Sequence, residues 1–214
     1  MYVPKLFQED NWPEIRKVID ENSFATLVSC DAGIPVATHV PVRLIESPPG
    51  TWKLQGHMAR ANQHWRLFER EQKSLVIFGG AHTYVSPRWY EKVNVPTWNY
   101  LTVHVYGKPS VVHDTGELRE LLRGLVDRYE GHIEAGGRYT LESLPTDYLE
   151  SQMRGIVGFE IPVEEVQASF KLSQNRNERD YDNVIAELRK SDDPGAQGVA
   201  QAMLCRHARE NRNG

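Results

Sequence analysis

The fold is decided by a strand–turn–strand pattern in the stretch FATLVSCDAGIPVATHVPVRLI, residues 24–45. Phe24–Cys30 is apolar, Val36–Ile45 alternates β-branched residues with others, and Asp31–Gly33 between them has the composition of a turn. Two alternating segments joined by such a turn predict a β-hairpin. Proline cannot donate a hydrogen bond to a neighbouring strand, so we expect Pro41 at an edge or a bulge.

Further strands and several helices are predicted on both sides of this hairpin. Strands are expected at Trp52–His57, Ser74–Phe78, Thr83–Val85, Asn99–Tyr106 and Val157–Val166. Helices are expected at Asn11–Glu21, at Ala61–Gln72, from Asp114 onward, near Asp147–Arg154, at Asn177–Lys190 and at about Gly195–Arg209. Asn11 and Asp114 each precede a glutamate by three residues, the spacing of a capping box. Strands surrounded by helices in this order indicate an α+β domain built on an antiparallel sheet or barrel.

The composition limits the class of protein. The chain has 214 residues, of which 40% are hydrophobic and 25% charged, which suits one large domain or two small ones. A formal charge of −4 argues against an avid nonspecific nucleic-acid binder. No stretch approaches the roughly 18 apolar residues of a membrane span, and the first residues lack a secretory signal. Cys30 and Cys205 are expected to be free thiols in a cytoplasmic protein.

Familiar catalytic and metal-binding motifs are missing from the sequence. It contains no GxGxxG, HExxH, CxxC or GxSxG motif, so no catalytic residue can be named. The eight histidines are dispersed and include no pair with helical i, i+4 spacing. We therefore predict no metal site.

Three polar or aromatic segments near predicted strand ends are candidates for ligand binding. Gly56–Asn62 places Arg60 just before a predicted helix, and the free N–H groups of a helix start favour a phosphate. Trp98–Tyr100 places large aromatic surfaces next to an amide, and Lys171–Arg176 is a run of polar side chains. Together they suit a phosphorylated, flat heteroaromatic ligand.

Each of these segments also has an ordinary structural interpretation. Trp98 could fill the core, Arg60 could be a solvated charge at a helix start, and Lys171–Arg176 could lead into a helix capped by Asn177. The sequence alone leaves both interpretations open.

Six sequence blocks, in order along the chain, resemble the PaiB family. They are MYVPKLF (1–7), HVPVRL (39–44), GHMARANQHW (56–65), HTYVSPRWY (82–90), VPTWNYLTVHVYG (95–107) and FKLSQNR (170–176). Members of that family are described as FMN-binding negative transcriptional regulators. The resemblance implies the FMN-binding split β-barrel, an antiparallel, Greek-key-like α+β fold shared with pyridoxamine-phosphate oxidases. We expect this barrel with its peripheral helices over residues 1–176, a helical C-terminal extension packed on the same domain over 177–214, and a homodimer.

The resemblance also implies which residues bind the cofactor. The strand that runs beside the flavin supplies Thr38, His39 and Val40, and the phosphate-binding block supplies His57, Arg60 and Asn62. Trp98 and Asn99 of the dimer partner are expected to close the ring pocket. We further expect the Lys171–Arg176 segment to complete that pocket, because the Gln174 amide can match the ring's donors and acceptors and Lys171 can stabilise negative charge on the ring.

Three functional hypotheses remain at this point. The first is an FMN-binding, cytoplasmic, homodimeric negative transcriptional regulator, for which direct contact with DNA is weakly supported by the charge. The alternative is a flavin-dependent oxidoreductase that acts on a small molecule, and bleaching by NADH or NADPH would distinguish it. The third is a protein that handles haem, since split barrels of that kind exist.

Overall fold

The computed structural model divides the chain into two compact units. It describes every residue except 71, 132, 134–136, 138 and 214, and the side chains of 210–213 are also left out. One unit, here called the terminal unit, comprises Met1–Asn22, Phe78–His104 and Gln167–Gly214. The other, called the hairpin unit, comprises Ser23–Ile77 and Val105–Val166. Each unit is described by itself below.

Eight strands form the sheet on which the fold is built. They are β1 (Phe24–Asp31), β2 (Ile34–Glu46), β3 (Trp52–Ala59), β4 (Ser74–Val85), β5 (Thr97–Gly107), β6 (Ser110–Val112), β7 (Ile156–Pro162) and β8 (Glu165–Lys171). Hydrogen bonds join them in the order β6-β7-β3-β2-β1-β4-β5-β8. Every strand pairing within the hairpin unit is antiparallel. The prediction of an α+β fold on an antiparallel sheet is confirmed.

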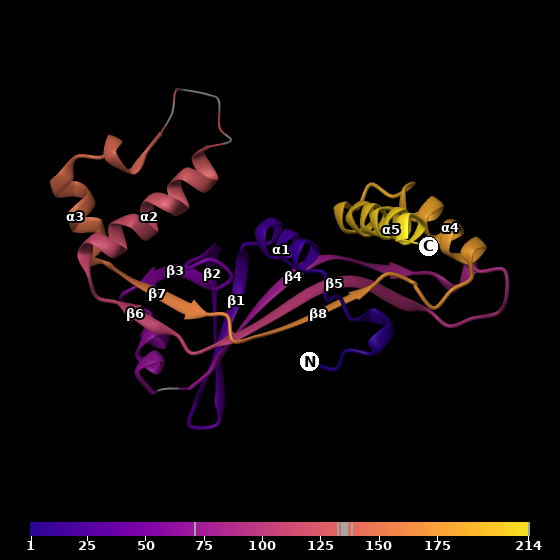
Figure 1. Cartoon of the computed structure of the whole chain (residues 1–214), viewed down its shortest axis with the longest axis horizontal. Helices are drawn as coiled ribbons and strands as arrows, with labels where there is room; N and C mark the ends of the chain where they lie inside the picture. The colour runs from indigo at the N-terminus through magenta and orange to yellow at the C-terminus, as the bar shows by residue number, and fades with distance from the viewer. Residues whose placement is uncertain (71, 132, 134–136, 138, 214) are drawn as a thin grey trace. The chain divides into compact units, whose positions relative to one another are not determined.

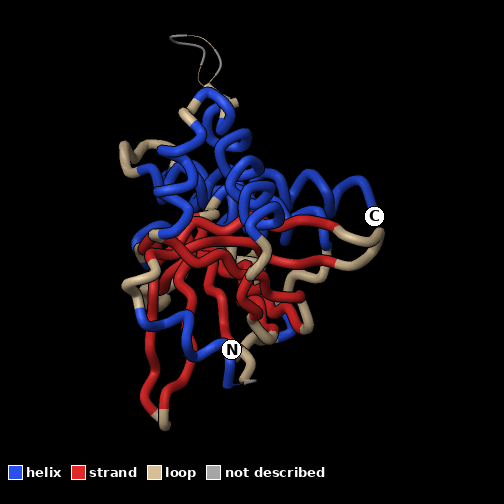
Figure 2. The backbone as a smooth tube through the Cα atoms, turned by 90° about the vertical axis from the view of Figure 1, so that its left-hand side faces the viewer, coloured by secondary structure: helices blue, strands red, loops and turns tan. Residues whose placement is uncertain are grey.

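The predicted hairpin is formed by β1 and β2. Asp31 lies opposite Ile34, and the two residues between them, Ala32 and Gly33, have φ angles of 49° and 86°. Positive φ at both central residues is the geometry of a two-residue turn that matches the twist of the flanking strands. The tip of the hairpin points away from the helices of its unit, as Figures 1 and 2 show.

Strand β2 changes its main partner at Pro41. It pairs with β1 up to Pro41 and with β3 from Val42 onward, and the Val42 N–H donates to the Ser23 carbonyl oxygen at 2.9 Å. Pro41 was expected at an edge or a bulge, and it stands instead in an inner strand where β2 changes partner, a place that tolerates a residue without an N–H donor. Gly56 of β3 lies close by, and a Cβ there would come within 2.7 Å of the Phe159 ring.

Helices α2 (Thr115–Glu130) and α3 (Thr146–Arg154) belong to the hairpin unit and lie together in Figure 1. They pack through a cluster of buried side chains, namely Leu118, Leu141, Leu149 and Met153. The short 3-10 turn η4 (Leu141–Ser143) contributes Leu141 to this cluster. The helix predicted at Ala61–Gln72 is instead the 3-10 helix η2 (Gln63–Arg70), which buries His64, Leu67 and Phe68.

The terminal unit contains α1 (Trp12–Glu21), α4 (Glu178–Leu188), α5 (Pro194–Asn213) and the 3-10 turns η1 (Lys5–Phe7) and η3 (Pro87–Trp89). Helices α4 and α5 pack against each other, and the Tyr181 hydroxyl donates to the Met203 carbonyl oxygen at 2.9 Å. Asn11 caps α1 and Asn177 caps α4, as predicted. None of the described helices combines the length and the apolar composition that crossing a membrane requires.

The predicted boundaries differ from the structure where proline or a short strand is involved. Ser74–Phe78 and Thr83–Val85 are parts of one strand, β4. The strand expected at Val157–Val166 with an interruption at Pro162 is two strands, β7 ending at Pro162 and β8 beginning at Glu165. Strand β6 was not predicted because three residues carry too little periodicity to be recognised. The expected domain boundary at residue 176 stays a prediction.

The cap of α2 offers a test of local stability. The Asp114 side chain accepts a hydrogen bond from the Glu117 N–H at 2.8 Å. Asp114→Ala should lower the free energy of unfolding by about 1 kcal/mol, because a helix N–H loses its partner. Asp114→Asn keeps an acceptor in place and serves as the control in urea denaturation. Equal losses for the two variants would contradict this role.

Candidate functional site

The turn that follows β3, here called the arginine turn (Ala59–Asn62), is held rigidly by hydrogen bonds. The Asn62 N–H donates to the Ala59 carbonyl oxygen at 2.9 Å, and the Arg60 N–H donates to the Gly155 carbonyl oxygen at 2.8 Å. The indole N–H of Trp65 donates to the Arg60 carbonyl oxygen at 3.0 Å. Both backbone polar groups of Arg60 are therefore fixed.

The Arg60 side chain is fixed as well. Its Nε donates to the Arg154 carbonyl oxygen and its Nη2 to the Ile156 carbonyl oxygen, both at 2.9 Å. Arg60 forms no ion pair with any residue that the structure describes. The positive charge is therefore oriented but not neutralised, and Nη1 can still donate to an anion.

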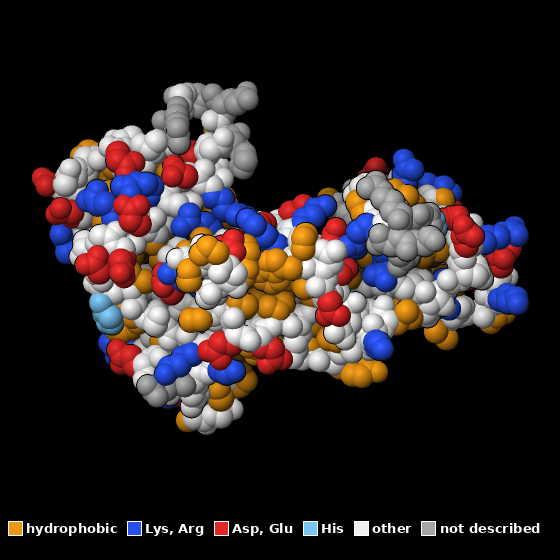
Figure 3. Space-filling model, in the orientation of Figure 1, with side chains coloured by type: hydrophobic (Ala, Val, Ile, Leu, Met, Phe, Trp, Pro, Cys, Tyr) orange, Lys and Arg blue, Asp and Glu red, His pale blue; other side chains and the backbone are white. Residues whose placement is uncertain are grey.

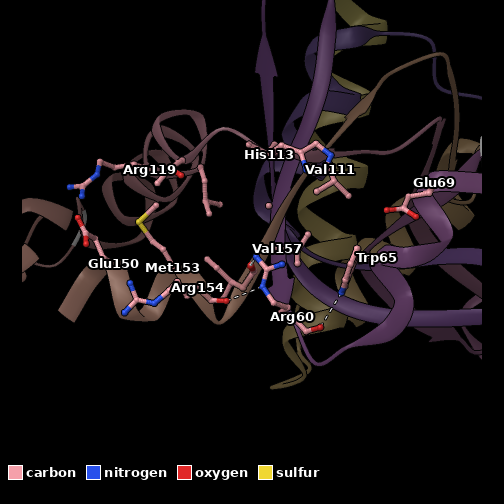
Figure 4. A pocket seen from close by; sticks show the side chains of 15 residues that line it. Arg60, Trp65, Glu69, Val111, His113, Arg119, Glu150, Met153, Arg154 and Val157 are labelled. Carbon is pink, nitrogen blue, oxygen red and sulfur yellow. Dashed lines mark hydrogen bonds between the residues drawn. The ribbon is translucent and has the colours of Figure 1, made fainter. Parts of the chain in front are cut away.

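A pocket of about 520 Å³ opens beside the Arg60 guanidinium (Figure 4). Its apolar lining comes from α2, α3, β6 and β7 and comprises Val111, Val112, Leu118, Met153, Ile156 and Val157. Trp65, Glu69 and His113 also line the pocket, and Figure 4 shows them on the same side as Val111. In Figure 4 the guanidinium groups of Arg119 and Arg154 extend toward Glu150, away from Arg60. Arg60, Arg119 and Arg154 all line the pocket, and Arg60 is the one that a hydrogen bond to the Ile156 carbonyl oxygen holds at the start of β7.

A chain of polar side chains lies next to the arginine turn in the hairpin unit. His64 Nδ1 is 2.8 Å from Thr38 Oγ1, and His64 Nε2 is 2.8 Å from Ser29 Oγ. Ser29 Oγ in turn lies 2.7 Å from Ser74 Oγ. The Asn62 amide donates to Thr38 Oγ1 at 3.2 Å and its oxygen accepts from the His64 N–H at 3.0 Å.

Two histidines of this region are held neutral by their surroundings. Burial lowers the pKa of both His57 and His64, because the charged imidazolium is poorly solvated there. His57 Nδ1 is buried and has no hydrogen-bond partner within the described part of the chain. The positive charge at this end of the hairpin unit therefore comes from arginine and not from histidine.

The three residues predicted on β2 have different surroundings. Thr38 joins the hydrogen-bonded chain, whereas Val40 is buried in the core. His39 lies on the other face of the strand, where its ring centroid is 6.3 Å from that of Phe24. Thr38, Arg60 and Asn62 are therefore brought close to one another, and His39 faces away from Thr38.

The remaining predicted residues belong to the terminal unit. The Asn99 side chain is fully buried and donates to Ser173 Oγ at 2.8 Å. Ser173 has a φ of 63°, so the start of the Lys171–Arg176 segment is a tight turn. The Gln174 side chain closes this turn, accepting from the Leu172 N–H at 2.7 Å and donating to the Phe170 carbonyl oxygen.

Lys171 and Trp98 have contrasting environments in the same unit. Lys171 ends β8, and its ammonium group donates to Thr97 Oγ1 and lies 5.8 Å from the centre of the Phe7 ring. Burial, with a contribution from the charge of Arg176, lowers the pKa of Lys171. Trp98 is 54% exposed, so the interpretation that it fills the core is wrong.

The predicted site residues thus fall into two groups. Thr38, His39, Val40, His57, Arg60 and Asn62 lie in the hairpin unit, and Trp98, Asn99, Lys171 and Gln174 lie in the terminal unit. Their roles in binding stay predictions. No cluster of metal-ligating side chains occurs in the part of the chain that the structure describes.

Sequence reasoning missed His64, Trp65 and the carbonyl oxygens that anchor Arg60. His64 and Trp65 were visible in the block GHMARANQHW, where an aromatic pair follows the turn at the start of η2. The Arg154 and Ile156 carbonyl oxygens carry no side-chain signal. They lie 94 and 96 residues away along the chain, so only the fold could show them.

The curled antiparallel sheet with peripheral helices defines a split-barrel protein. Residues 1–165 match the family described as “Putative FMN-binding domain”, and the chain belongs to this family. It is 44% identical over 203 residues to the protein named Protease synthase and sporulation protein PAI 2 from Bacillus subtilis. That similarity covers 95% of this chain and 96% of the relative. The resemblance to the PaiB family is confirmed.

Solved structures support the fold. The flavocytochrome Anf3 from Azotobacter vinelandii has a TM-score of 0.60 at 14% identity, over 85% of this chain and 78% of that one. The FAD and heme binding protein from Mycobacterium smegmatis has a TM-score of 0.59 at 15% identity, over 77% of this chain and 73% of that one. At such identities the similarity concerns the fold alone, and it confirms the split-barrel prediction.

The lowered histidine pKa values predict how stability depends on pH. An unfolded histidine binds a proton near its ordinary pKa of 6.5, whereas folded His57 binds one only at lower pH. The unfolded state therefore binds more protons as the pH falls below about 6.5, and the free energy of unfolding should fall with it.

Replacing His57 should reduce this dependence. In urea denaturation between pH 8 and pH 5, His57→Gln should give a shallower slope than the wild type, by at most about 1.4 kcal/mol per pH unit. Any difference at pH 8, where both proteins are neutral at this position, measures the packing effect of the substitution alone. Parallel pH profiles would contradict the assignment.

Proposed function

We propose that the chain is an FMN-binding protein and that Arg60 binds the FMN phosphate. The observation that supports this most strongly is the geometry of Arg60, whose guanidinium is fixed by two carbonyl oxygens and lacks an ion pair within the described residues. An oriented, unneutralised arginine is a favourable partner for a phosphate. Membership of the FMN-binding family supports the choice of ligand.

The surroundings of Arg60 fit such a ligand. The adjoining pocket has a volume of about 520 Å³, within the usual range for cofactor sites, and one of its walls is apolar. Bound FMN would supply redox chemistry, whereas these residues would supply affinity and orientation.

The predicted ring-binding residues are the second part of this proposal. Trp98 is exposed and flanked by Tyr84, whose ring centroid is 6.1 Å away, so it can contact a second copy of the chain. Asn99, Lys171 and Gln174 are held by hydrogen bonds within their own unit. We propose that the ring meets Trp98 of a partner chain and that Lys171 and Gln174 complete the ring pocket, whereas the fully buried Asn99 supports this surface through its hydrogen bond to Ser173.

We propose that the partner is a second copy bound through the outer face of the hairpin unit. This face comprises Phe24, Thr26, Val28 and Cys30 of β1, Pro35, Ala37, His39 and Pro41 of β2, and Leu75 and Ile77 of β4. All of these residues are exposed or half-buried, and none is Lys, Arg, Asp or Glu. A large, uncharged face of this kind favours association with an identical face across a twofold axis.

We further propose a regulatory role in the cytoplasm for the FMN-bound dimer. The description of PaiB proteins as negative transcriptional regulators supports the role, and the free Cys30 and Cys205 thiols suit the compartment. On the face shown in Figure 3, Lys and Arg lie among Asp and Glu. Any direct contact with DNA would therefore use a small basic surface.

The phosphate assignment predicts the effect of removing Arg60. Arg60→Ala should weaken FMN binding by about 1.5–3 kcal/mol, the value of a hydrogen bond to a charged group, and should weaken riboflavin binding much less. The measurement is a titration of flavin fluorescence with wild type and variant. Arg70→Ala, which removes an arginine paired with Asp31 on the same unit, is the control and should leave both affinities unchanged. Equal losses for FMN and riboflavin would place Arg60 outside the phosphate site.

The dimer proposal predicts the solution mass. Light scattering should give about twice the 24.5 kDa of one chain at micromolar concentration. Phe24→Lys places a charge at a side chain that is 69% exposed on the outer face, and it should produce monomers. Tyr148→Lys, at an exposed aromatic residue of α3, should remain dimeric. A wild-type mass of a single chain would contradict the proposal.

A further inference from the structure

Three side chains close a ring of hydrogen bonds at the end of the arginine turn. Asn62 Oδ1 accepts from the His64 N–H at 3.0 Å, Asn62 Nδ2 donates to Thr38 Oγ1 at 3.2 Å, and Thr38 Oγ1 lies 2.8 Å from His64 Nδ1. Both ends of the Asn62 amide are therefore occupied. The orientation of Asn62 is fixed by His64 and Thr38 together.

The imidazole of His64 joins this ring to strand β1. Its Nε2 lies 2.8 Å from Ser29 Oγ, which continues to Ser74 Oγ at 2.7 Å. Only 2% of the His64 surface is exposed, and its ring packs 5.8 Å from that of Phe68. A neutral imidazole has one donor and one acceptor, and two hydroxyl groups can satisfy both nitrogens in either tautomer.

We infer that His64 is a positioning residue for the phosphate-binding turn, acting through Thr38 and Asn62. This inference rests on the proposed function, because it assigns His64 a task only if the arginine turn holds the FMN phosphate. The Asn62 N–H closes the turn by donating to the Ala59 carbonyl oxygen at 2.9 Å, so an Asn62 released by His64 and Thr38 would loosen the backbone that carries Arg60, even though the Arg154 and Ile156 carbonyl oxygens still hold its side chain. Two nitrogens of one ring thus have separate tasks. Nδ1 contacts Thr38 next to the proposed ligand site, and Nε2 contacts Ser29, which links β1 to Ser74 of β4.

Two pairs of variants separate these tasks. Thr38→Val removes the hydroxyl on the Nδ1 side, and Ser29→Ala removes the hydroxyl on the Nε2 side. His64→Asn places an amide atom near the position of Nδ1, whereas His64→Gln places one near the position of Nε2. Each pair contains one variant that preserves the contact with Thr38 and one that loses it.

The experiment measures the ratio of FMN affinity to riboflavin affinity for all four variants, alongside their thermal unfolding midpoints. Thr38→Val and His64→Gln should reduce the ratio by about five- to tenfold, as expected for a lost hydrogen bond that orients the phosphate partner. Ser29→Ala and His64→Asn should keep the ratio within about twofold of wild type, even where they lower the unfolding midpoint, because the Thr38 contact survives.

The possible failures of the two proposals are distinguishable. If the wild type prefers FMN to riboflavin and the two members of each pair change the ratio equally, His64 is merely structural and the inference is overturned. If the wild type binds both flavins equally, the phosphate assignment itself is wrong and the inference is overturned with it. Should one His64 variant fail to fold, the other decides the question against the wild type: an unchanged ratio for His64→Gln, or a ratio for His64→Asn that falls five- to tenfold, overturns the inference.

Discussion

The hydrogen bonds from the Arg60 guanidinium to the Arg154 and Ile156 carbonyl oxygens are the interaction on which the candidate site depends. They join the residue that follows β3 to the start of β7. The two strands also pair in the sheet, from Ala59 opposite Ile156 to Lys53 opposite Pro162. A flexible arginine would lose side-chain entropy on binding an anion. Here folding has already fixed the side chain, so less side-chain entropy would be lost when its charged group binds an anion.

The sheet places this arginine where it can act. Strand β2 pairs with β1 before Pro41 and with β3 after it. Thr38 lies in the part of β2 that pairs with β1, and its hydroxyl accepts a hydrogen bond from Asn62 in the turn after β3. His64 fills the space beneath that turn and satisfies Thr38 and Ser29 at once. The apolar wall beyond Arg60 comes from β6, β7, α2 and α3, and the two helices contribute Leu118 and Met153, which also pack against each other's helix. The fold, the turn and the pocket are therefore parts of one arrangement within the hairpin unit.

The sequence predicted the features that have local causes. The β1–β2 turn followed from Asp31–Gly33, and the helix starts at Asn11, Asp114 and Asn177 followed from their capping residues. Arg60 was predicted to bind a phosphate from its place before a helix start, a role that stays a prediction, and the helix that follows is a 3-10 helix. Contacts between residues far apart in the sequence could not be predicted. The carbonyl partners of Arg60 and the contact of His64 with Ser29 join residues that only the folded sheet brings together, and nothing in residues 98–99 indicated that Trp98 is exposed while Asn99 is buried.

The central claim is that the Arg60 guanidinium binds the phosphate of FMN, and the most direct test is a crystal structure of the wild-type chain grown with FMN. The account predicts a phosphate oxygen within about 3 Å of an Arg60 Nη atom, with the contacts of Arg60 to the Arg154 and Ile156 carbonyl oxygens preserved. FMN bound with its phosphate away from Arg60, or with the arginine turn rearranged so that those carbonyl contacts are broken, would contradict it.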